Sequence, residues 1–302
     1  MNPTRFGIAS LPNKIDLYYE TFGNEANPPV LLIMGLDTQC LAFTEEFIQP
    51  LLDNDFYCIR FDNRDIGKST WLNHTWHRKS PYTLEDMAQD SIFLLDYLNL
   101  PKVHLIGVSM GGMIAQRLAI SFSERILSIC SIMSSAFMYD VSVTKKWQEK
   151  LYFPLLPFLF RHFHINHPIL HPQITVRFYM KMYRYLNGTK FRYDEEELRK
   201  IVTEGIDIRK GQNPKARYQQ FCAIIASGSR IQEIPQINIP FLVIHGSADP
   251  IVPVNHAYKL ASLNKTAKLV IVEGMGHTMP KEAFSFFLPP IIESFKHKLT
   301  RQ

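Results

Sequence analysis

The sequence predicts an α/β fold, a doubly wound and mostly parallel β-sheet with a helical insertion between two of its strands. Short apolar runs alternate with helix-like segments over residues 1–140, and the same alternation returns over residues 232–302. The stretch between them has no apolar run of the buried-strand kind. With 302 residues, 46% of them hydrophobic, the chain is long enough to form one large core.

Four apolar runs in the first half are expected to form strands that are buried on both faces of the sheet. They lie at residues 30–34, 56–61, 103–108 and 126–133. A helix is expected between the second and third runs, because Thr83 and Asp86 have the spacing of a capping box. The apolar positions that follow have helical spacing: Leu84, Met87, Ala88, Ile92, Leu95 and Leu98.

The C-terminal part repeats this pattern. Residues 241–244 and 268–272 are expected to be strands, with a helix over residues 254–263 between them. A last helix is expected over residues 283–299, interrupted near its middle by Pro289 and Pro290. Strands that alternate with helices favour a parallel sheet covered on both faces.

The middle section, residues 141–231, is expected to form irregular helices. It holds 16 Lys and Arg against 7 Asp and Glu, a balance of +9, which leaves the rest of the chain at −4. A helical insertion between two parallel strands is most simply a lid over the carboxyl edge of the sheet, where such sheets bind ligands. We therefore expect a core of residues 1–140 and 232–302 with a lid of residues 141–231; a separate second domain is disfavoured because the strand pattern resumes.

A G-x-S-x-G motif centred on Ser109 carries the first chemical signal. It follows the apolar run at residues 103–108 directly and opens a helix expected over residues 110–120. Glycines in this setting permit a sharp turn that lifts the serine clear of the sheet, at a helix N-terminus that favours developing negative charge. A flexible turn without catalytic function is the alternative.

A serine hydroxyl needs a base to remove its proton and a third group to orient that base. Asp249 follows the strand expected at residues 241–244, and His277 follows the next strand. The chain order Ser109, Asp249, His277 is the order in which this sheet architecture supplies a triad. Taken singly, Asp249 could form a turn before Pro250 and His277 could cap a helix.

Hydrolysis also requires hydrogen-bond donors for the oxyanion. The backbone N–H of Met110, the residue after the nucleophile, is expected to be one donor. The other is expected to be the N–H of Leu36, in the loop after the strand at residues 30–34, because Gly35 lets the backbone approach the site. In the alternative interpretation, Gly35 only permits a tight turn.

With these motifs the sequence resembles the α/β-hydrolase superfamily over nearly its whole length. More narrowly, it resembles the carboxylesterase-like group that includes aclacinomycin methylesterase. The matching stretches are residues 31–36, 62–69, 104–112 and 245–253. The resemblance implies an eight-stranded α/β-hydrolase sheet with a lid, the catalytic residues Ser109, Asp249 and His277, and an oxyanion hole at Leu36 and Met110.

The chain departs from the superfamily pattern at two places. Met34 and Gly35 stand where many members have His-Gly, and Arg64 and Asp65 stand where they have Arg-Gly. The narrower group shares both variants, so they bear on the subfamily. The lid matches poorly outside residues 223–228, which leaves the substrate open because lids set substrate choice.

The expected activity is cleavage of a carboxylic ester of a small molecule through an acyl-enzyme, with no cofactor and no metal. The same triad also serves thioesters, lactones, carbon–carbon cleavage of diketones and peroxide-dependent acyl chemistry, and it cannot separate them. A dehalogenase is disfavoured, because its nucleophile would be an aspartate in the place of Ser109. The rival from another class is a ligand-binding receptor with slow or no turnover, for which the apolar run at residues 151–160 would offer a partner surface.

Several other features have a simpler explanation than a functional one. The lid histidines are interpreted as surface or packing residues instead of metal ligands, and its aromatic residues as packing, with some lining an acyl pocket. These residues are His162, His164, His167, His171, Phe153, Phe158, Phe160, Phe163, Tyr179, Tyr183 and Tyr185. His104 and His245 are expected to pack in the sheet with one hydrogen-bond partner each. Asp62 and Arg64 are expected to fix the turn after their strand.

The composition disfavours a nucleic-acid-binding protein and favours a cytoplasmic one. The net charge of +5 comes without a run of basic residues, which disfavours nucleic-acid binding. Four scattered cysteines without a C-x-x-C pair, and an N-terminus without an apolar stretch, favour a cytoplasmic protein. A solvated face is the simplest interpretation of the basic lid; steering of anionic substrates and contact with an anionic lipid surface are the alternatives.

Overall fold

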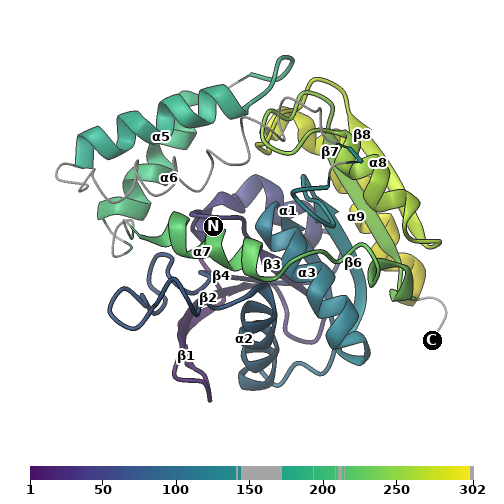
Figure 1. Ribbon diagram of the computed structural model, residues 1–302, viewed down its shortest axis with the longest axis horizontal. Helices are drawn as coiled ribbons and strands as arrows, with labels where there is room; N and C mark the ends of the chain where they lie inside the picture. Colours follow the sequence, from purple (N-terminus) through teal and green to yellow (C-terminus); the bar gives the residue numbers. More distant parts are fainter. Residues whose placement is uncertain are drawn as a thin grey trace.

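The computed structural model describes residues 1–140, 142–143, 172–192, 194–207, 209, 213 and 215–299. Eight strands form one sheet in the order β1-β2-β4-β3-β5-β6-β7-β8 (Figure 1). Their bounds are β1 Arg5–Ser10, β2 Asp16–Phe22, β3 Pro29–Ile33, β4 Tyr57–Phe61, β5 Val103–Val108, β6 Ile126–Ile132, β7 Phe241–Gly246 and β8 Ala267–Val272. The eight-stranded, mostly parallel sheet is thus confirmed.

The only antiparallel pairs among the described strands are β1 with β2 and β2 with β4. The strands from β4 to β8 pair in parallel. The apolar runs did not single out the hairpin of β1 and β2. One reason is that β1 is an edge strand that buries only Ala9, so it lacks the continuous apolar run on which the other predictions depend.

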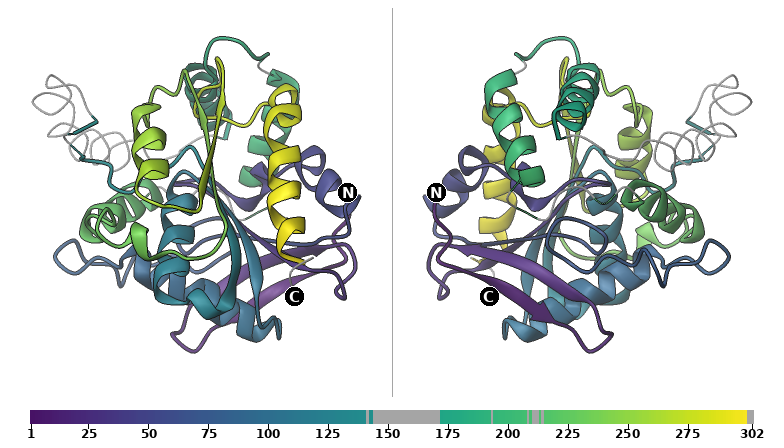
Figure 2. Two further views of the ribbon diagram at one scale, coloured as in Figure 1. Left: turned by 90° about the vertical axis from the view of Figure 1, so that its right-hand side faces the viewer. Right: turned by 90° about the vertical axis from the view of Figure 1, so that its left-hand side faces the viewer.

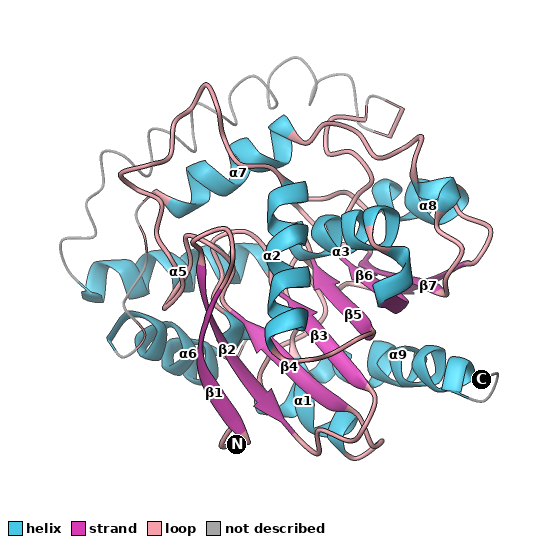
Figure 3. Cartoon of the chain, turned by 90° about the horizontal axis from the view of Figure 1, so that it is seen from below, coloured by secondary structure: helices cyan, strands magenta, loops and turns pink. Residues whose placement is uncertain are grey.

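Helices cover both faces of the sheet, and Figure 3 shows them on either side of it. Helices α2 (Leu84–Tyr97), α3 (Met110–Ser121) and α8 (Asn255–Ser262) pack on one face, while α1 (Glu45–Leu52) and α9 (Phe284–Leu299) pack on the other. Each face has its own apolar cluster, because successive side chains of a strand point to opposite faces. Short 3-10 turns lie at η1 Cys40–Ala42, η2 Ser123–Arg125, η4 Ile234–Gln236 and η5 Lys281–Ala283.

Helix α2 begins where its capping residues predicted. The Thr83 hydroxyl accepts a hydrogen bond from the Asp86 amide, and the Asp86 carboxylate accepts one from the Thr83 amide at 2.7 Å. This capping box satisfies two backbone donors that a helix start would otherwise leave unpaired.

Helix α9 corrects one prediction. The helix continues through Pro289 and Pro290 instead of being interrupted there. The carbonyls left without a donor belong to the exposed residues Ser285 and Phe286, where water can replace the missing bonds. The opposite face of the helix holds it in place, because Phe287, Ile291 and Phe295 are fully buried against the sheet. Packing therefore outweighs the low helix propensity of proline.

Among the described residues between β6 and β7, the α-helices are α5 (Pro172–Leu186), α6 (Glu195–Asp207) and α7 (Ala216–Ala226). In the views of Figure 2, α5 lies at one end of the molecule, beyond the sheet. These helices are regular, whereas the sequence predicted irregular ones. Part of the expected lid lies outside the described residues, including the run at residues 151–160, the four lid histidines, and Phe153, Phe158, Phe160 and Phe163. The expected boundaries at residues 141 and 231 stay predictions.

Within the described ranges, no helix combines the length and the apolar character that a membrane span requires.

Candidate active site

Ser109 occupies a sharp turn between β5 and α3. Its backbone has φ 55° and ψ −116°, a conformation that an L-residue rarely adopts. The two glycines of the motif are required by close packing: a Cβ on Gly107 would lie 2.2 Å from the Gly111 carbonyl oxygen, and one on Gly111 would lie 2.0 Å from the Ile33 carbonyl oxygen. Strand, turn and helix are thus too close for any side chain at these positions.

His277 and Asp249 lie beside Ser109 at the carboxyl ends of neighbouring strands. The His277 Nε2 is 2.9 Å from the Ser109 Oγ, and the His277 Nδ1 is 2.6 Å from the Asp249 Oδ2. The other carboxylate oxygen of Asp249 accepts hydrogen bonds from the Ile251 and Val252 amides, both at 2.8 Å. The chain thus brings the three expected residues into one line of hydrogen bonds.

The charge of Asp249 fixes the histidine tautomer. Burial alone would raise the pKa of Asp249, but the charge of His277 and hydrogen bonds from His245 and His277 outweigh it and hold that pKa below its usual range. The carboxylate is therefore ionised near neutral pH and accepts the Nδ1–H of His277. The Nε2 of a neutral His277 is then the acceptor for the Ser109 hydroxyl proton.

His245 makes more contacts than its sequence position predicted. Its Nε2 lies 2.8 Å from the Val252 carbonyl oxygen and 3.4 Å from the Asp249 Oδ2. The Val252 carbonyl is the hydrogen-bond partner expected for a histidine packed in the sheet, and the loop after β7 also folds back over the strand end and brings Asp249 near the ring. His245 and His277 thus approach the same carboxylate oxygen of Asp249.

The two expected oxyanion donors both lie next to Ser109. Met110 is the first residue of α3, and Leu36 follows β3 in a loop that touches Ser109: a Cβ on Gly35 would lie 3.1 Å from the Ser109 Cβ. Neither the Leu36 nor the Met110 amide makes a hydrogen bond with the described part of the chain. Both amides are therefore available to a ligand.

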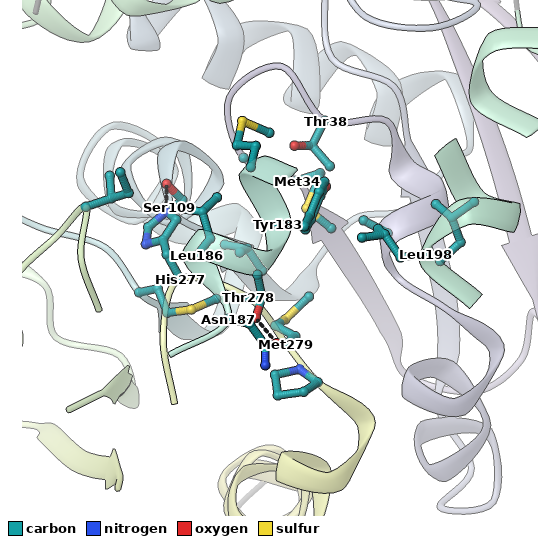
Figure 4. Close-up of a pocket in the computed structure, with 18 of the residues that line it drawn as sticks. Met34, Thr38, Ser109, Tyr183, Leu186, Asn187, Leu198, His277, Thr278 and Met279 are labelled. Carbon is teal, nitrogen blue, oxygen red and sulfur yellow. Dashed lines mark hydrogen bonds between the residues drawn. The ribbon is translucent and has the colours of Figure 1, made fainter. Parts of the chain in front are cut away.

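A cavity of about 780 Å³ opens beside Ser109 and His277. Figure 4 shows these two residues close to Leu186, with Tyr183 and Leu198 on the other side of the pocket. Six methionines line it: Met34, Met113, Met133, Met138, Met182 and Met279. Methionine side chains adapt to ligand shape, so the cavity suits a large apolar group.

The end of α5 contacts the loop that carries His277. The His277 amide donates to the Leu186 carbonyl at 2.6 Å, and the Gly276 amide donates to the Asn187 carbonyl at 3.2 Å. The Thr278 hydroxyl also donates to the Asn187 side chain at 2.9 Å, as Figure 4 shows. The insertion is therefore bonded directly to the candidate base.

Sequence reasoning missed a second contact between the insertion and the site. Asp37, next to Leu36, is buried and forms an ion pair with Arg217 of α7, with the Arg217 Nη2 2.6 Å from the Asp37 Oδ2. Tyr179 of α5 donates to the same oxygen at 2.9 Å. Asp37 lay directly beside an expected donor, but no sequence pattern relates it to residues more than 140 positions away.

His104, Asp62 and Arg64 contact other parts of the fold and lie outside the line of hydrogen bonds at Ser109. His104 is buried, hydrogen-bonded to Ser128 at 2.7 Å and stacked on Phe295, as its packing interpretation predicted. The Asp62 carboxylate accepts from the Lys68 amide across its turn. Arg64 instead pairs with Asp90 of α2 at 2.6 Å, so the expectation that it fixes its own turn was wrong.

All four cysteines are free, and Cys40, Cys58 and Cys130 are buried. Burial raises the pKa of these three thiols, which makes them poor nucleophiles. Among the residues that the structure describes, no group of three or more His, Cys, Asp or Glu side chains is placed to hold a metal ion.

The fold and the strand–serine–helix turn define an α/β hydrolase, and a comparison with protein families agrees. The chain belongs to the family described as the alpha/beta hydrolase fold, whose model matches residues 28–283. It is similar to rhodomycin D methylesterase DnrP of Streptomyces peucetius, with 27% identity over 89% of this chain and 91% of the relative. It is also similar to 3-oxoadipate enol-lactonase 2 of Acinetobacter baylyi, with 23% identity over 93% and 94%.

Solved structures show the same fold. A bromoperoxidase from Bacillus anthracis superposes with a TM-score of 0.74 at 22% identity, covering 98% of this chain and 100% of its own. A meta-cleavage product hydrolase from Pseudomonas fluorescens IP01 superposes with a TM-score of 0.72 at 19% identity, covering 96% and 97%. Together, the family and the methylesterase relatives support a hydrolase; the solved structures add the fold alone.

Proposed function

We propose that this protein is a serine hydrolase that cleaves a carboxylic ester through an acyl-enzyme. The observation that carries the proposal is the line of hydrogen bonds from Ser109 through His277 to Asp249. It lies beside an apolar cavity and two backbone amides that make no hydrogen bond with the described residues. Nucleophile, base, orienting carboxylate and oxyanion donors are the parts that acyl transfer requires.

In the proposed reaction, the Ser109 Oγ attacks the ester carbonyl while the His277 Nε2 takes its proton. Asp249 stabilises the imidazolium that forms, and the Leu36 and Met110 amides hold the oxyanion of the tetrahedral intermediate. Collapse breaks the ester C–O bond, and His277 returns the proton to the leaving alcohol. A water molecule then attacks the acyl group on Ser109, with His277 as the base, and releases the acid.

The proposed substrate is a small-molecule ester with a bulky apolar group. A cavity of about 780 Å³ lies within the range of drug-sized ligand sites, and its lining is mostly apolar. Two of its polar side chains are occupied by the protein: Thr38 donates to the Leu36 carbonyl, and Asn187 accepts from Thr278. We further propose that residues 141–231 act as a lid over a core of residues 1–140 and 232–302, because α5 and α7 contact the site from above the strand ends.

The first experiment is the intact mass of the protein after exposure to a fluorophosphonate. We expect a single adduct on the wild type and none on Ser109→Ala, because only a serine activated by its base attacks phosphorus rapidly. Hydrolysis of p-nitrophenyl butyrate should fall at least 1000-fold in the same variant, a loss of about 4 kcal/mol of transition-state stabilisation. A panel of esters, thioesters and lactones would then identify the acyl bond.

The matched control is Ser121→Ala, which removes an exposed hydroxyl from the last residue of the same helix. It should react like the wild type. An adduct that persists on Ser109→Ala, or unchanged hydrolysis by that variant, would show that another residue is the nucleophile. A wild type that gains no adduct would favour a ligand-binding receptor built on this fold.

A further inference from the structure

The loop after β3 contains Leu36, one of the expected oxyanion donors. The next residue, Asp37, is hydrogen-bonded to the insertion. Asp37 receives three hydrogen bonds on its Oδ2, from the Arg217 Nε at 2.9 Å, the Arg217 Nη2 at 2.6 Å and the Tyr179 hydroxyl at 2.9 Å. Its backbone amide donates to the Gln220 side chain at 2.8 Å. Both the carboxylate and the amide of Asp37 are therefore held by residues of α5 and α7.

The conformation of this loop needs such support. Asp37 has φ 58°, in the left-handed region that disfavours most L-residues. On the core side the loop is held by the Asn63 side chain, which donates to the Met34 carbonyl at 3.0 Å. Asp37 lies on the other side of Leu36. In the described part of the chain, its side chain and its amide are hydrogen-bonded by residues of α5 and α7.

We propose that Arg217 and Tyr179 are positioning residues for the oxyanion hole, which hold the Leu36 amide in place through Asp37. The proposal rests on the proposed function, because it assigns a role within the same reaction. It gives the insertion a second role besides enclosing the substrate. When α5 and α7 are docked, the loop of residues 34–37 keeps the conformation in which the Leu36 amide faces the developing charge.

The physical reason is that an oxyanion hole acts only if its donors are already in position. A donor that must move to meet the charge loses most of its effect, and removal of one donor typically lowers the catalytic rate by about 100- to 1000-fold. Asp37, Arg217 and Tyr179 are all less than 10% exposed, so their bonds are weakly screened by solvent although Asp37 and Arg217 also line the cavity. A buried carboxylate with fewer donors would rotate toward water and carry the backbone with it.

The test compares Tyr179→Phe and Arg217→Lys with a matched control, Arg209→Lys. Tyr179→Phe removes one hydroxyl from a residue that does not line the large cavity. Arg217→Lys keeps the charge but loses the fork that places two donors on one oxygen. Arg209, in the same insertion, pairs with Glu20 and Asp62 of the core. Within the described part of the chain it makes no hydrogen bond to residues 34–37, so its variant reports the effect of loosening the insertion alone.

The readout is the rate of Ser109 phosphonylation, resolved into the binding constant KI and the limiting rate kinact, with p-nitrophenyl butyrate kinetics alongside. We expect kinact and kcat to fall about 10- to 100-fold in Tyr179→Phe and Arg217→Lys, while KI and KM stay within about threefold. Arg209→Lys should keep all four constants within about threefold, even where its melting temperature falls.

Two results would overturn the positioning role. In one, both variants fold with the wild-type circular dichroism spectrum and react as fast as the wild type. In the other, KI and KM rise while kinact and kcat hold, which is the signature of altered substrate binding. If Arg217→Lys fails to fold, Tyr179→Phe decides the question. A wild type that is never phosphonylated at Ser109 would instead refute the proposed function itself, so the two failures are distinct.

Discussion

Single side chains near the site have charges that are set by their surroundings, and His256 of α8 is a clear example. It is buried beside His245, with Asp140 and Asp249 near enough to act on its charge. Burial, and then the charge of His245, lower the pKa of His256 to about 4, while the two carboxylates oppose this effect. The folded protein therefore keeps His256 neutral at pH values where an exposed histidine is protonated.

This difference predicts a loss of stability in mild acid. Below about pH 6.5 the unfolded chain binds a proton at His256 that the folded chain does not, so the free energy of unfolding falls until pH about 4, where the folded state is protonated too. Between pH 7 and 4.5 we expect this residue to account for about 2–3 kcal/mol. Urea unfolding of the wild type and of His256→Gln at both pH values measures it. The prediction is wrong if the free energy of unfolding falls equally in the wild type and in His256→Gln between pH 7 and 4.5.

Individual site residues differed in how far the sequence alone could place them. Ser109, Asp249 and His277 follow strands that their apolar runs reveal, and carboxyl ends of parallel strands meet at one edge, so their meeting was predictable. Asp37 and Arg217 lie 180 positions apart, and their pairing depends on how the insertion docks. No local pattern encodes that docking, so this part of the site was not predictable.

At the scale of one element, α9 shows packing acting against propensity. Pro289 removes the hydrogen bond to the Ser285 carbonyl, and its own side chain lies on the exposed face. Pro289→Ala should therefore restore a bond without loss of packing and raise the free energy of unfolding. We expect a gain of about 1–2 kcal/mol, after subtracting the smaller entropic benefit that proline gives by restricting the unfolded chain.

A proline outside a helix is the matched control for that gain. Pro101 lies on an exposed loop between α2 and β5. Pro101→Ala should lower the free energy of unfolding slightly, by about 0.5–1 kcal/mol, because only the entropic effect operates there. Thermal melts of both variants give the comparison. Equal shifts of the same sign would show that the helix does not depend on the missing bond.

Elements with a strong local signal were predicted well, and those without one were missed. The strands β3 to β8 match their apolar runs within a few residues, and α2 begins at its capping box. The hairpin of β1 and β2 and the short helix α1 had no such signal: β1 is largely exposed, and α1 contains Pro50. The count of eight strands came from the family resemblance, not from the runs.

Across the whole molecule, buried ion pairs join the insertion to the sheet. Arg209 donates to Glu20 of β2 at 2.6 Å and to Asp62, just after β4, at 2.9 Å. Arg60 pairs with the other oxygen of Glu20 at 2.7 Å. Since these groups are shielded from water, each carboxylate depends on its partners for stabilisation.

Removal of the Arg209 charge should therefore destabilise the protein strongly. Arg209→Met leaves two buried carboxylates short of a partner, and we expect a loss of about 3 kcal/mol in the free energy of unfolding. Arg209→Lys should lose less, because an ammonium keeps the charge although it reaches fewer acceptors. Urea titrations followed by tryptophan fluorescence measure both. A loss below about 1 kcal/mol in Arg209→Met would mean that Arg60 and the nearby amides suffice.

The bonds between the end of α5 and the His277 loop have a consequence for protein engineering. The bridge between Gly188 and Met275 and the hydrogen bond from the His277 amide to the Leu186 carbonyl attach the insertion to the loop of His277, the proposed base. Specificity could be exchanged by a chimera that takes its insertion from a related hydrolase. Such a chimera would lose these bonds to the His277 loop together with the original wall of the pocket. Such a graft should retain turnover only if its junctions preserve residues 186–188, Tyr179 and Arg217.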